Sequence, residues 1–191
     1  HGRFDPVTEA DRAAERIIRE AIEHSYPEHG IYGEEFGHRP GNGLTWVIDP
    51  IDGTRAFLTG MLHWGVLVAL FDGQKPVVGV MHQPFTGETF YGDNHTAYYR
   101  RGSEERRLHT RRCTSLEEAM LTTTSPKLFR RPEQRAAFDR LEAAVKLSKY
   151  GGDCYIYAMV AMGYVDLATD CDLKPYDIQA LMPIIRGAGG V

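Results

Sequence analysis

Apolar residues recur every three or four positions in the first part of the chain, a spacing that predicts an amphipathic α-helix. Thr8 and Asp11 have the separation of a capping box, so the helix is expected to begin just after Thr8. The expected apolar face consists of Ala13, Ala14, Ile17, Ile18, Ala21 and Ile22. Tyr26-Pro27 follows, and the proline predicts the end of the helix there.

The segments after this helix have the composition of strands. A short apolar run at 44–48 predicts a buried strand, and Asp49-Pro50-Ile51-Asp52-Gly53-Thr54 is expected to end it, because proline and Asp-Gly interrupt strands. Turns at Asp72-Gly73 and at 84–87 separate further candidate strands. Their ranges are 64–71, 76–83, 89–91 and 97–100. This order predicts an antiparallel sheet.

The remainder of the chain alternates helices and strands. Ser115 and Glu118 have the spacing of a second capping box, which predicts a short helix. The pattern then predicts strands at 120–124, 147–150 and 165–169 and helices at 132–145, 154–162 and 176–187. Pro183 lies inside the last helix, so a kink is expected there. The complete order predicts an α/β protein with helices layered over mixed sheets.

Composition excludes several function classes. The 191 residues carry 22 Lys plus Arg against 26 Asp plus Glu, and a net charge of −4 argues against a nucleic-acid partner. A hydrophobic share of 42% is typical of a globular protein with a core. The longest apolar runs, 66–71 and 155–162, are far shorter than the roughly 20 residues of a membrane span, so no membrane partner is expected. Residues 1–5 contain neither an initiating Met nor a signal-peptide core, which predicts a cytoplasmic protein whose start lies upstream.

Cysteine and histidine add no site of their own. Cys113, Cys154 and Cys171 are odd in number and contain no Cys-x-x-Cys pair, so neither a disulfide framework nor a zinc site is predicted. Buried, reduced thiols are expected instead. The eight histidines show no ligand spacing, and no role is assigned to them.

Asp49 and Asp52 are the first candidates for chemistry. Both carboxylates, with the Ile51 carbonyl between them, can converge on one point and offer the oxygen ligands that Mg²⁺ takes. The alternative is a solvated Asp-Gly turn, the more frequent outcome for such a sequence alone. An EF-hand is excluded because the alternating ligand series and its closing Glu are missing. Gly53 and Thr54 then open a short apolar segment, whose first N–H groups would suit a phosphate.

Other acids also stand at expected element ends. Glu34 and Glu35 follow Gly33 and are compatible with an ordinary surface pair. Asp11 is equally compatible with a capping partner, and Asp177 with a first-turn acid favoured by the helix dipole. Side chains at turns and element ends can converge, so the acids taken together favour a shared site.

Three motifs connect these acids with a known family. They are Gly33-Glu34-Glu35, Trp46-Val47-Ile48-Asp49-Pro50-Ile51-Asp52-Gly53-Thr54, and Pro175-Tyr176-Asp177 with the later Gly187-Ala188-Gly189-Gly190. Together they resemble the inositol monophosphatase superfamily of Mg²⁺-dependent, lithium-sensitive phosphatases, over essentially the whole chain. Segments 4–11, 151–155 and 173–177 are most similar to the bacterial histidinol-phosphate phosphatase branch. Tyr176 departs from the inositol phosphatases, which usually carry Trp before that Asp.

The resemblance implies a set of metal ligands. Glu34, Asp49, the Ile51 carbonyl and Thr54 would surround a first Mg²⁺ ion. Asp49, Asp52 and Asp177 would hold a second. Asp11 and Glu34 would serve a third, weaker site, and Mn²⁺ is expected to substitute for Mg²⁺.

The resemblance also implies an architecture. The expected fold is the αβαβα sandwich, as one phosphatase domain over residues 1–191 with further polypeptide on either side. Two parts are expected within it, about 1–112 with the metal motif and antiparallel sheet, and about 113–191 with mixed α/β structure. A homodimer is expected because the superfamily commonly dimerises.

The implied reaction is transfer of a phosphoryl group to water, which needs no protein nucleophile. Glu34 and the Thr54 hydroxyl are the candidates to orient the water, and the N–H groups of Gly53 and Thr54 the candidates to hold the phosphate. Asp153 and Asp170 are expected on the substrate side, where an acid suits the ammonium group of histidinol phosphate. Asp153 is equally compatible with a helix N-cap.

Other substrates and one other function class stay open. Acidic groups also accept hydrogen bonds from inositol hydroxyls, so inositol monophosphate or a phosphonucleotide is the rival substrate. A catalytically silent, metal-binding scaffold is the rival function. Retention of Glu34, Asp49, Asp52 and Asp177 together favours the enzyme. Cys154, Tyr155 and Tyr157 are expected to pack rather than react.

Overall fold

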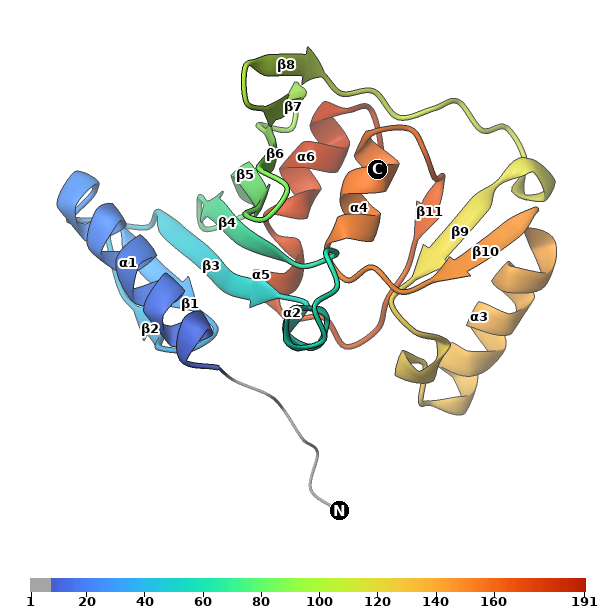
Figure 1. The fold of residues 1–191 in the computed structure, drawn as a ribbon, viewed down its shortest axis with the longest axis horizontal. Helices are drawn as coiled ribbons and strands as arrows, with labels where there is room; N and C mark the ends of the chain where they lie inside the picture. The colour runs from blue at the N-terminus through green and yellow to red at the C-terminus, as the bar shows by residue number, and fades with distance from the viewer. Residues whose placement is uncertain (1–7) are drawn as a thin grey trace.

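The computed structural model describes residues 8–191, so the part of the family resemblance at residues 4–7 lies outside the described residues. The helices are α1 (Glu9–Ser25), α2 (Thr54–Leu58), α3 (Pro132–Ala144), α4 (Tyr155–Ala161), α5 (Pro175–Ile178) and α6 (Leu181–Gly187). The strands are β1 (Gly30–Gly33), β2 (Gly37–Arg39), β3 (Thr45–Asp52), β4 (Gly65–Phe71), β5 (Pro76–Gln83), β6 (Glu88–Gly92), β7 (Ala97–Arg101), β8 (Glu104–Arg107), β9 (Met120–Thr123), β10 (Leu147–Tyr150) and β11 (Leu167–Ala168). Figure 1 shows their arrangement.

A large sheet of eight strands forms the centre of the molecule. Its order is β2-β1-β3-β4-β5-β6-β7-β8, and the pairs from β3 to β8 are antiparallel, as predicted for the strands between 64 and 100. β1 and β3 are the exception, because they run parallel. Adjacent parallel strands end at the same edge of a sheet, and that edge carries the candidate site.

A second, three-stranded sheet has the order β10-β9-β11 and is entirely parallel. Its apolar residues pack against α3, where the rings of Phe129 and Phe138 stack with centroids 4.4 Å apart. Leu121 of β9 is fully buried in the same cluster. This sheet therefore has its own small core.

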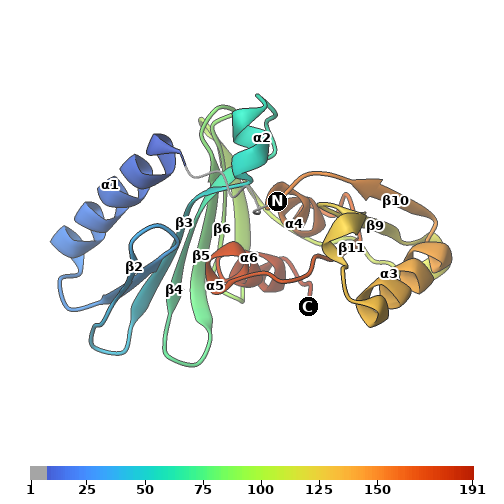
Figure 2. The same ribbon diagram turned by 90° about the horizontal axis from the view of Figure 1, so that it is seen from below.

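The layers follow one another across the molecule in Figure 2, from α1 through the large sheet, α4 to α6 and the small sheet to α3. This confirms the αβαβα architecture. The main core lies between the large sheet and α4 and α6, with Leu67, Met81, Phe90, Leu181 and Ile184 at its centre. Strands β1 to β8 form the large sheet and β9 to β11 the small one. The later helices α4 to α6 nevertheless pack against the large sheet. No helix within residues 8–191 has the length and apolar composition that crossing a membrane requires.

Local sequence signals placed several elements correctly. Thr8 and Asp11 form the predicted capping box at the start of α1, with the Thr8 N–H donating to the Asp11 carboxylate at 2.9 Å. Tyr26 ends the helix as expected. The predicted ranges 76–83 and 147–150 coincide with β5 and β10.

Other boundaries were predicted wrongly. β3 continues to Asp52 instead of ending at Ile48, because its pairing with β4 shifts between Asp49 and Asp52 and so accommodates Pro50, which lacks an N–H. β1, β2 and β8 were not predicted. β1 and β2 are short and contain glycine, and β8 consists of exposed charged residues, so none carries an alternating pattern.

The second capping box and the last helix also differ. Ser115 precedes a single 3₁₀ turn, Leu116–Glu118, and its side chain makes no capping hydrogen bond. The predicted helix 176–187 is two helices, α5 and α6, and the chain breaks before Pro183 rather than kinking at it. Pro183 lies in the first turn of α6, where a missing N–H removes no intrahelical bond.

Candidate active site

The parallel strands β1 and β3 bring two predicted ligands to one edge of the large sheet. Gly33 lies opposite Ile48 in the register of this pair. The N–H of Glu34 donates to the Ile48 carbonyl at 3.2 Å. Glu34 and Asp49 therefore follow the last paired residues side by side.

The end of β3 is held by hydrogen bonds within its own segment. Asp49 is 2% exposed, and its carboxylate accepts from the N–H of Ile51 at 3.1 Å. The Thr54 hydroxyl donates to the Ile51 carbonyl at 3.2 Å. Three of the predicted ligand groups are thus fixed relative to one another.

Asp52 connects this segment with the second half of the chain. Its Oδ1 accepts from the N–H of Cys154 at 2.8 Å, a contact between residues 102 positions apart.

Burial and the charge of Asp52 raise the pKa of the Cys154 thiol well above its usual range, so the thiol stays protonated and packs rather than reacts. Cys113 and Cys171 are only half-buried, which corrects the expectation of three buried thiols, and all three cysteines are unpaired.

Asp177 completes the cluster from α5. One oxygen each from Asp49, Asp52 and Asp177 lies within 4.8 Å of the others. The Asp177 carboxylate also accepts from the N–H of Lys174 at 2.6 Å, which is the first-turn contact considered as its alternative role. The helix-start contact and membership of the cluster are therefore compatible.

These carboxylates disfavour one another's charge. Burial, and then the charge of Asp177, raises the pKa of Asp52 to about 8 and that of Glu34 to about 7. The pKa of Asp49 lies well above its usual range because of burial and the charge of Asp52. Burial also raises the pKa of Asp177. A group of crowded carboxylates beside a carbonyl is an all-oxygen donor set, and it fits a hard cation such as Mg²⁺.

A buried ion pair on α1 holds the turn that follows β1. Glu15 is fully buried and accepts hydrogen bonds from the N–H groups of Glu35 at 2.7 Å and Phe36 at 3.2 Å. Arg19 pairs with the same carboxylate at 2.7 Å. A Cβ at Gly33 would lie 1.9 Å from a Glu15 oxygen, so the turn requires glycine there. No role was predicted for Glu15, because Glu and Arg four positions apart on a helix usually form a surface pair.

Asp11 lies close to the same turn. It is 1% exposed and caps α1 through Thr8. Burial raises the pKa of Glu35, and the charge of Asp11 raises it further. Arg12, the residue after Asp11, forms an ion pair with Glu35 at 3.6 Å, so this end of α1 lies beside the acidic turn. The role of Asp11 at a third metal stays a prediction.

The turn at Gly53 leads from the carboxylates into α2. Gly53 has a φ of 87°, in the left-handed region that favours glycine, and a Cβ there would lie 3.0 Å from the Cβ of Asp153. The first N–H groups of a helix have no partner within it. The start of α2 therefore presents N–H groups next to the carboxylate cluster, where a phosphate was predicted.

The two predicted substrate-side acids have different surroundings. Asp170 accepts four hydrogen bonds, from the Thr123 hydroxyl at 2.8 Å, the Thr124 N–H at 2.9 Å, the Thr124 hydroxyl at 3.0 Å and the Tyr157 hydroxyl at 3.1 Å. Asp153 contacts His63, with Nδ1 and Oδ2 separated by 3.0 Å. His63 was given no role from sequence, because its spacing to other residues carries no ligand pattern.

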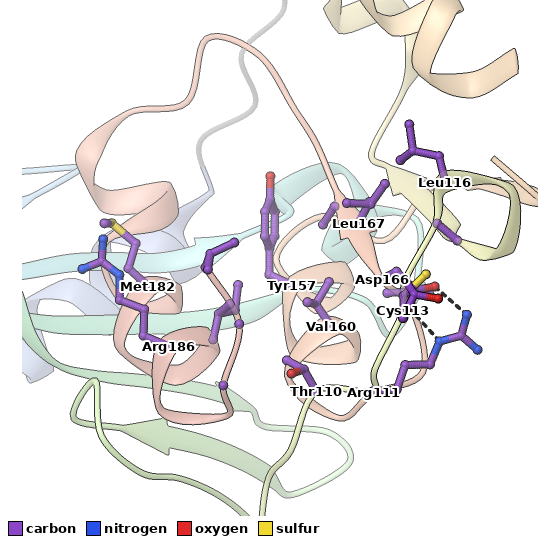
Figure 3. A pocket seen from close by; sticks show the side chains of 18 of the residues that line it. Thr110, Arg111, Cys113, Leu116, Tyr157, Val160, Asp166, Leu167, Met182 and Arg186 are labelled. Atoms are coloured by element: carbon purple, nitrogen blue, oxygen red, sulfur yellow. Dashed lines mark hydrogen bonds and ion pairs between the residues drawn. The ribbon is translucent and has the colours of Figure 1, made fainter. Parts of the chain in front are cut away.

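A cavity of about 760 Å³ lies apart from the carboxylate cluster, and none of the predicted ligands lines it. Figure 3 shows Tyr157 between Met182 and Arg186 on one side and Arg111 and Asp166 on the other. Arg111 binds the Asp166 carboxylate with two hydrogen bonds of 2.7 Å. The ring of Tyr157 therefore lines the cavity while its hydroxyl holds Asp170.

Comparisons with solved structures agree with this fold. An inositol monophosphatase from Zymomonas mobilis superposes with a TM-score of 0.87 and 41% sequence identity, over 98% of this chain and 72% of that one. An inositol monophosphatase from Thermotoga maritima gives a TM-score of 0.83 at 31% identity, over 98% of this chain and 71% of that one.

Sequence comparisons identify related proteins as well. The chloroplastic bifunctional phosphatase IMPL2 of Arabidopsis thaliana is 44% identical over 190 residues, which are 98% of this chain but 54% of that protein. The histidinol-phosphatase of Chlorobaculum parvum is 36% identical over 186 residues, 97% of this chain and 71% of that protein. The chain thus spans about half to three quarters of these relatives. The Inositol monophosphatase family matches residues 1–191, and the chain belongs to this family.

Proposed function

We propose that this chain forms the active site of a Mg²⁺-dependent phosphatase that hydrolyses L-histidinol phosphate to L-histidinol and phosphate. The observation that supports a phosphatase most directly is the carboxylate cluster beside the N-terminus of α2. Asp49, Asp52 and Asp177 offer convergent oxygens, and Gly53 and Thr54 lie at the adjoining turn. Membership of the family and relatives named histidinol-phosphatase support the reaction and the substrate.

In this proposal, different groups of the chain would bind different metal ions. Asp49, the Ile51 carbonyl, Glu34 and Thr54 would hold a first ion, and Asp49, Asp52 and Asp177 a second. Asp11 with Glu34 would serve a third, weaker ion. Two such ions would supply positive charge that stabilises the attacking and leaving oxygens of the phosphoryl group.

Other groups of the chain act on the phosphate and the attacking water. N–H groups of Gly53 and Thr54 bind the non-bridging phosphate oxygens, so charge that develops on them meets donors already in place. The Thr54 hydroxyl donates to the Ile51 carbonyl, which leaves its oxygen free to accept a proton of water. Glu34 orients the same water from the end of β1. The protonated Cys154 thiol supplies no nucleophile.

The substrate body is recognised by acids in this proposal. A protonated amine is costly to remove from water unless an anion receives it. Asp153 adjoins Gly53, and the charge of Asp170 acts on Asp153, so both acids belong to the same side of the site. Because Asp170 already accepts four hydrogen bonds from the chain, Asp153 is the better placed of the two to bind the amine.

Phosphate release from a panel of monoesters, with Mg²⁺ and with excess chelator, tests the proposal. We expect hydrolysis only with Mg²⁺ or Mn²⁺, and a preference for histidinol phosphate over inositol monophosphate. Asp153→Asn and Asp170→Asn should each lower kcat/KM for histidinol phosphate by roughly tenfold to a hundredfold, with little change for p-nitrophenyl phosphate.

Different outcomes of this experiment would overturn different parts of the proposed function. A preference for inositol monophosphate or a phosphonucleotide would replace the substrate, and equal losses on both esters would make the acids structural. Absence of any hydrolysis would favour a silent scaffold. The proposed enzyme is a cytoplasmic, lithium-sensitive homodimer, and these properties stay predictions.

A further inference from the structure

His63 makes the one side-chain hydrogen bond to the Asp153 carboxylate found among the described residues. Its Nδ1 lies 3.0 Å from Oδ2 of Asp153, with the His63 side chain 38% exposed and the Asp153 side chain 22% exposed. When Asp153 is ionised, its carboxylate can only accept, so Nδ1 of His63 then carries the proton and donates. The imidazole is thus an orienting donor for this acid.

The backbones of both residues are fixed beside the phosphate-binding turn. Asp153 has a φ of 42°, which is uncommon for a residue with a side chain, and Cys154 is tied to Asp52. His63 precedes Trp64, whose ring packs edge-on against Phe57 of α2 with centroids 5.0 Å apart. A Cβ at Gly53 would contact both Asp153 and the Trp64 backbone. The pair therefore has a defined position relative to the turn.

Among residues 8–191, one side-chain oxygen of Asp153 takes part in a hydrogen bond. Oδ2 bonds to His63, whereas Oδ1 has no hydrogen-bond partner within residues 8–191. Asp170 differs, because both of its oxygens are taken by four donors. A ligand with a donor group therefore finds a free acceptor at Asp153, next to the position predicted for the phosphate.

His63 also favours the charged form of this acid. Burial raises the pKa of Asp153, and the hydrogen bond and charge of His63 oppose that rise. Arg55 of α2 acts in the same direction, but it is exposed and makes no ion pair with Asp153 among the described residues. Loss of His63 would leave Asp153 less oriented and easier to protonate.

We propose that His63 is a positioning residue that makes the site prefer phosphate monoesters with a protonated amine, because it holds Asp153 with one carboxylate oxygen free to receive that amine. This rests on the proposed function, and it assigns the specificity of that site to a pair of residues. His63 acts through Asp153 and touches no reacting atom.

The test compares kcat/KM for histidinol phosphate with kcat/KM for inositol 1-phosphate, both with Mg²⁺. His63→Leu removes the donor at similar size, and the ratio of the two values should fall about tenfold, mainly through a higher KM for the amine ester. His63→Asn keeps an N–H near the position of Nδ1 and should restore most of the ratio. His95→Leu, at an exposed histidine of the turn between β6 and β7, is the matched control and should keep it.

A double-mutant cycle with Asp153→Asn separates positioning from a structural effect. If His63 acts through Asp153, adding His63→Leu to Asp153→Asn should change the ratio less than twofold. A further full loss in the double variant, or equal loss on both esters in His63→Leu and His63→Asn, would overturn the inference. If the unmutated protein prefers histidinol phosphate and His63→Leu keeps the same ratio of kcat/KM values, the role of His63 is overturned and the proposed substrate stands. No preference in the unmutated protein would overturn it together with the proposed substrate.

Discussion

Two buried carboxylates, Glu15 and Asp49, differ in what surrounds them. Glu15 is fully buried and is matched by a guanidinium and two N–H groups. Asp49 is 2% exposed and is surrounded by Asp52, Glu34 and Asp177, whose charges add to the effect of burial in raising its pKa. A buried acid matched by donors of the chain keeps its charge within the fold, whereas one surrounded by other acids must bind a proton or a cation. The difference separates structural from functional acids without reference to any motif.

The largest expected effect comes from removing one acid of the crowded cluster. Asp52→Asn keeps the size and removes a charge that Mg²⁺ would balance, so hydrolysis should fall by roughly a thousandfold or more, about 4 kcal/mol in the barrier. The same variant should melt at a higher temperature than the unmutated protein in chelator, because repulsion is relieved. Steady-state kinetics and thermal melts measure both, with the exposed Asp139→Asn as control. Full activity in excess chelator would contradict this prediction.

Removing the matched acid should have the opposite effect on stability. Glu15→Ala leaves Arg19 without its ion-pair partner and two N–H groups without their acceptor. The free energy of unfolding should therefore fall by about 3 kcal/mol. Urea denaturation measures the loss, and Glu20→Ala, at an exposed position of α1, is the matched control. The apparent affinity for Mg²⁺ should also fall, because Glu15 holds the turn that carries Glu34. A loss no larger than that of Glu20→Ala would show that the pair is not structural.

The pH dependence of the metal-free protein should expose the repulsion within the cluster. The Asp52 pKa is about 8 in the folded chain and about 4 when unfolded, so between these values the folded state binds more protons. This stabilisation is complete below about pH 4 and is lost as the pH rises toward 8, by on the order of 1 kcal/mol per pH unit. Urea midpoints at pH 5 to 8 in chelator should therefore fall with pH, and less steeply in Asp52→Asn.

Saturating Mg²⁺ provides the internal control for that measurement. The cation binds the ionised carboxylates, so its presence should make stability rise with pH over the same range. Identical profiles with and without Mg²⁺ would mean that the cluster does not bind the metal.

The smallest change in stability is expected at Asp11, which both accepts hydrogen bonds within the chain and lies near other acids. It caps α1 through Thr8, and its charge acts on the neighbouring acidic turn. Asp11→Asn should cost about 1 kcal/mol or less, because Asn also accepts a capping hydrogen bond. If Asp11 helps to hold a third metal, turnover should fall and the Mg²⁺ concentration for half-maximal activity should rise. An unchanged Mg²⁺ requirement would leave Asp11 with the capping role alone.

Local signals explain which parts of the fold were predictable. The capping residues of α1 and the turns of the antiparallel sheet lie in single stretches of sequence, and both were predicted well. The extension of β3 through Pro50 depends on pairing with β4, and β1 depends on its partner β3, so neither has a local signature.

The same distinction applies to the candidate site. Glu34, Asp49, Asp52 and Asp177 could be named because they belong to family motifs. Glu15 and His63 could not, since an ordinary helical Glu–Arg spacing and an isolated histidine gain meaning only from residues distant in sequence. The role of Asp170 on the substrate side stays a prediction, and its four internal hydrogen bonds could not be foreseen from sequence.

The contact between the Cys154 N–H and Asp52 joins residues 102 positions apart, and Asp177 reaches the cluster from still further along the chain. Contacts of such long range require the closure of long loops, which costs conformational entropy and is typical of slower folding. A chain that ends before α5 lacks Asp177, which completes the acidic cluster. Mg²⁺ would therefore bind the complete fold more tightly than a chain without Asp177. During refolding, Mg²⁺ would stabilise the molecules in which all the acids have come together.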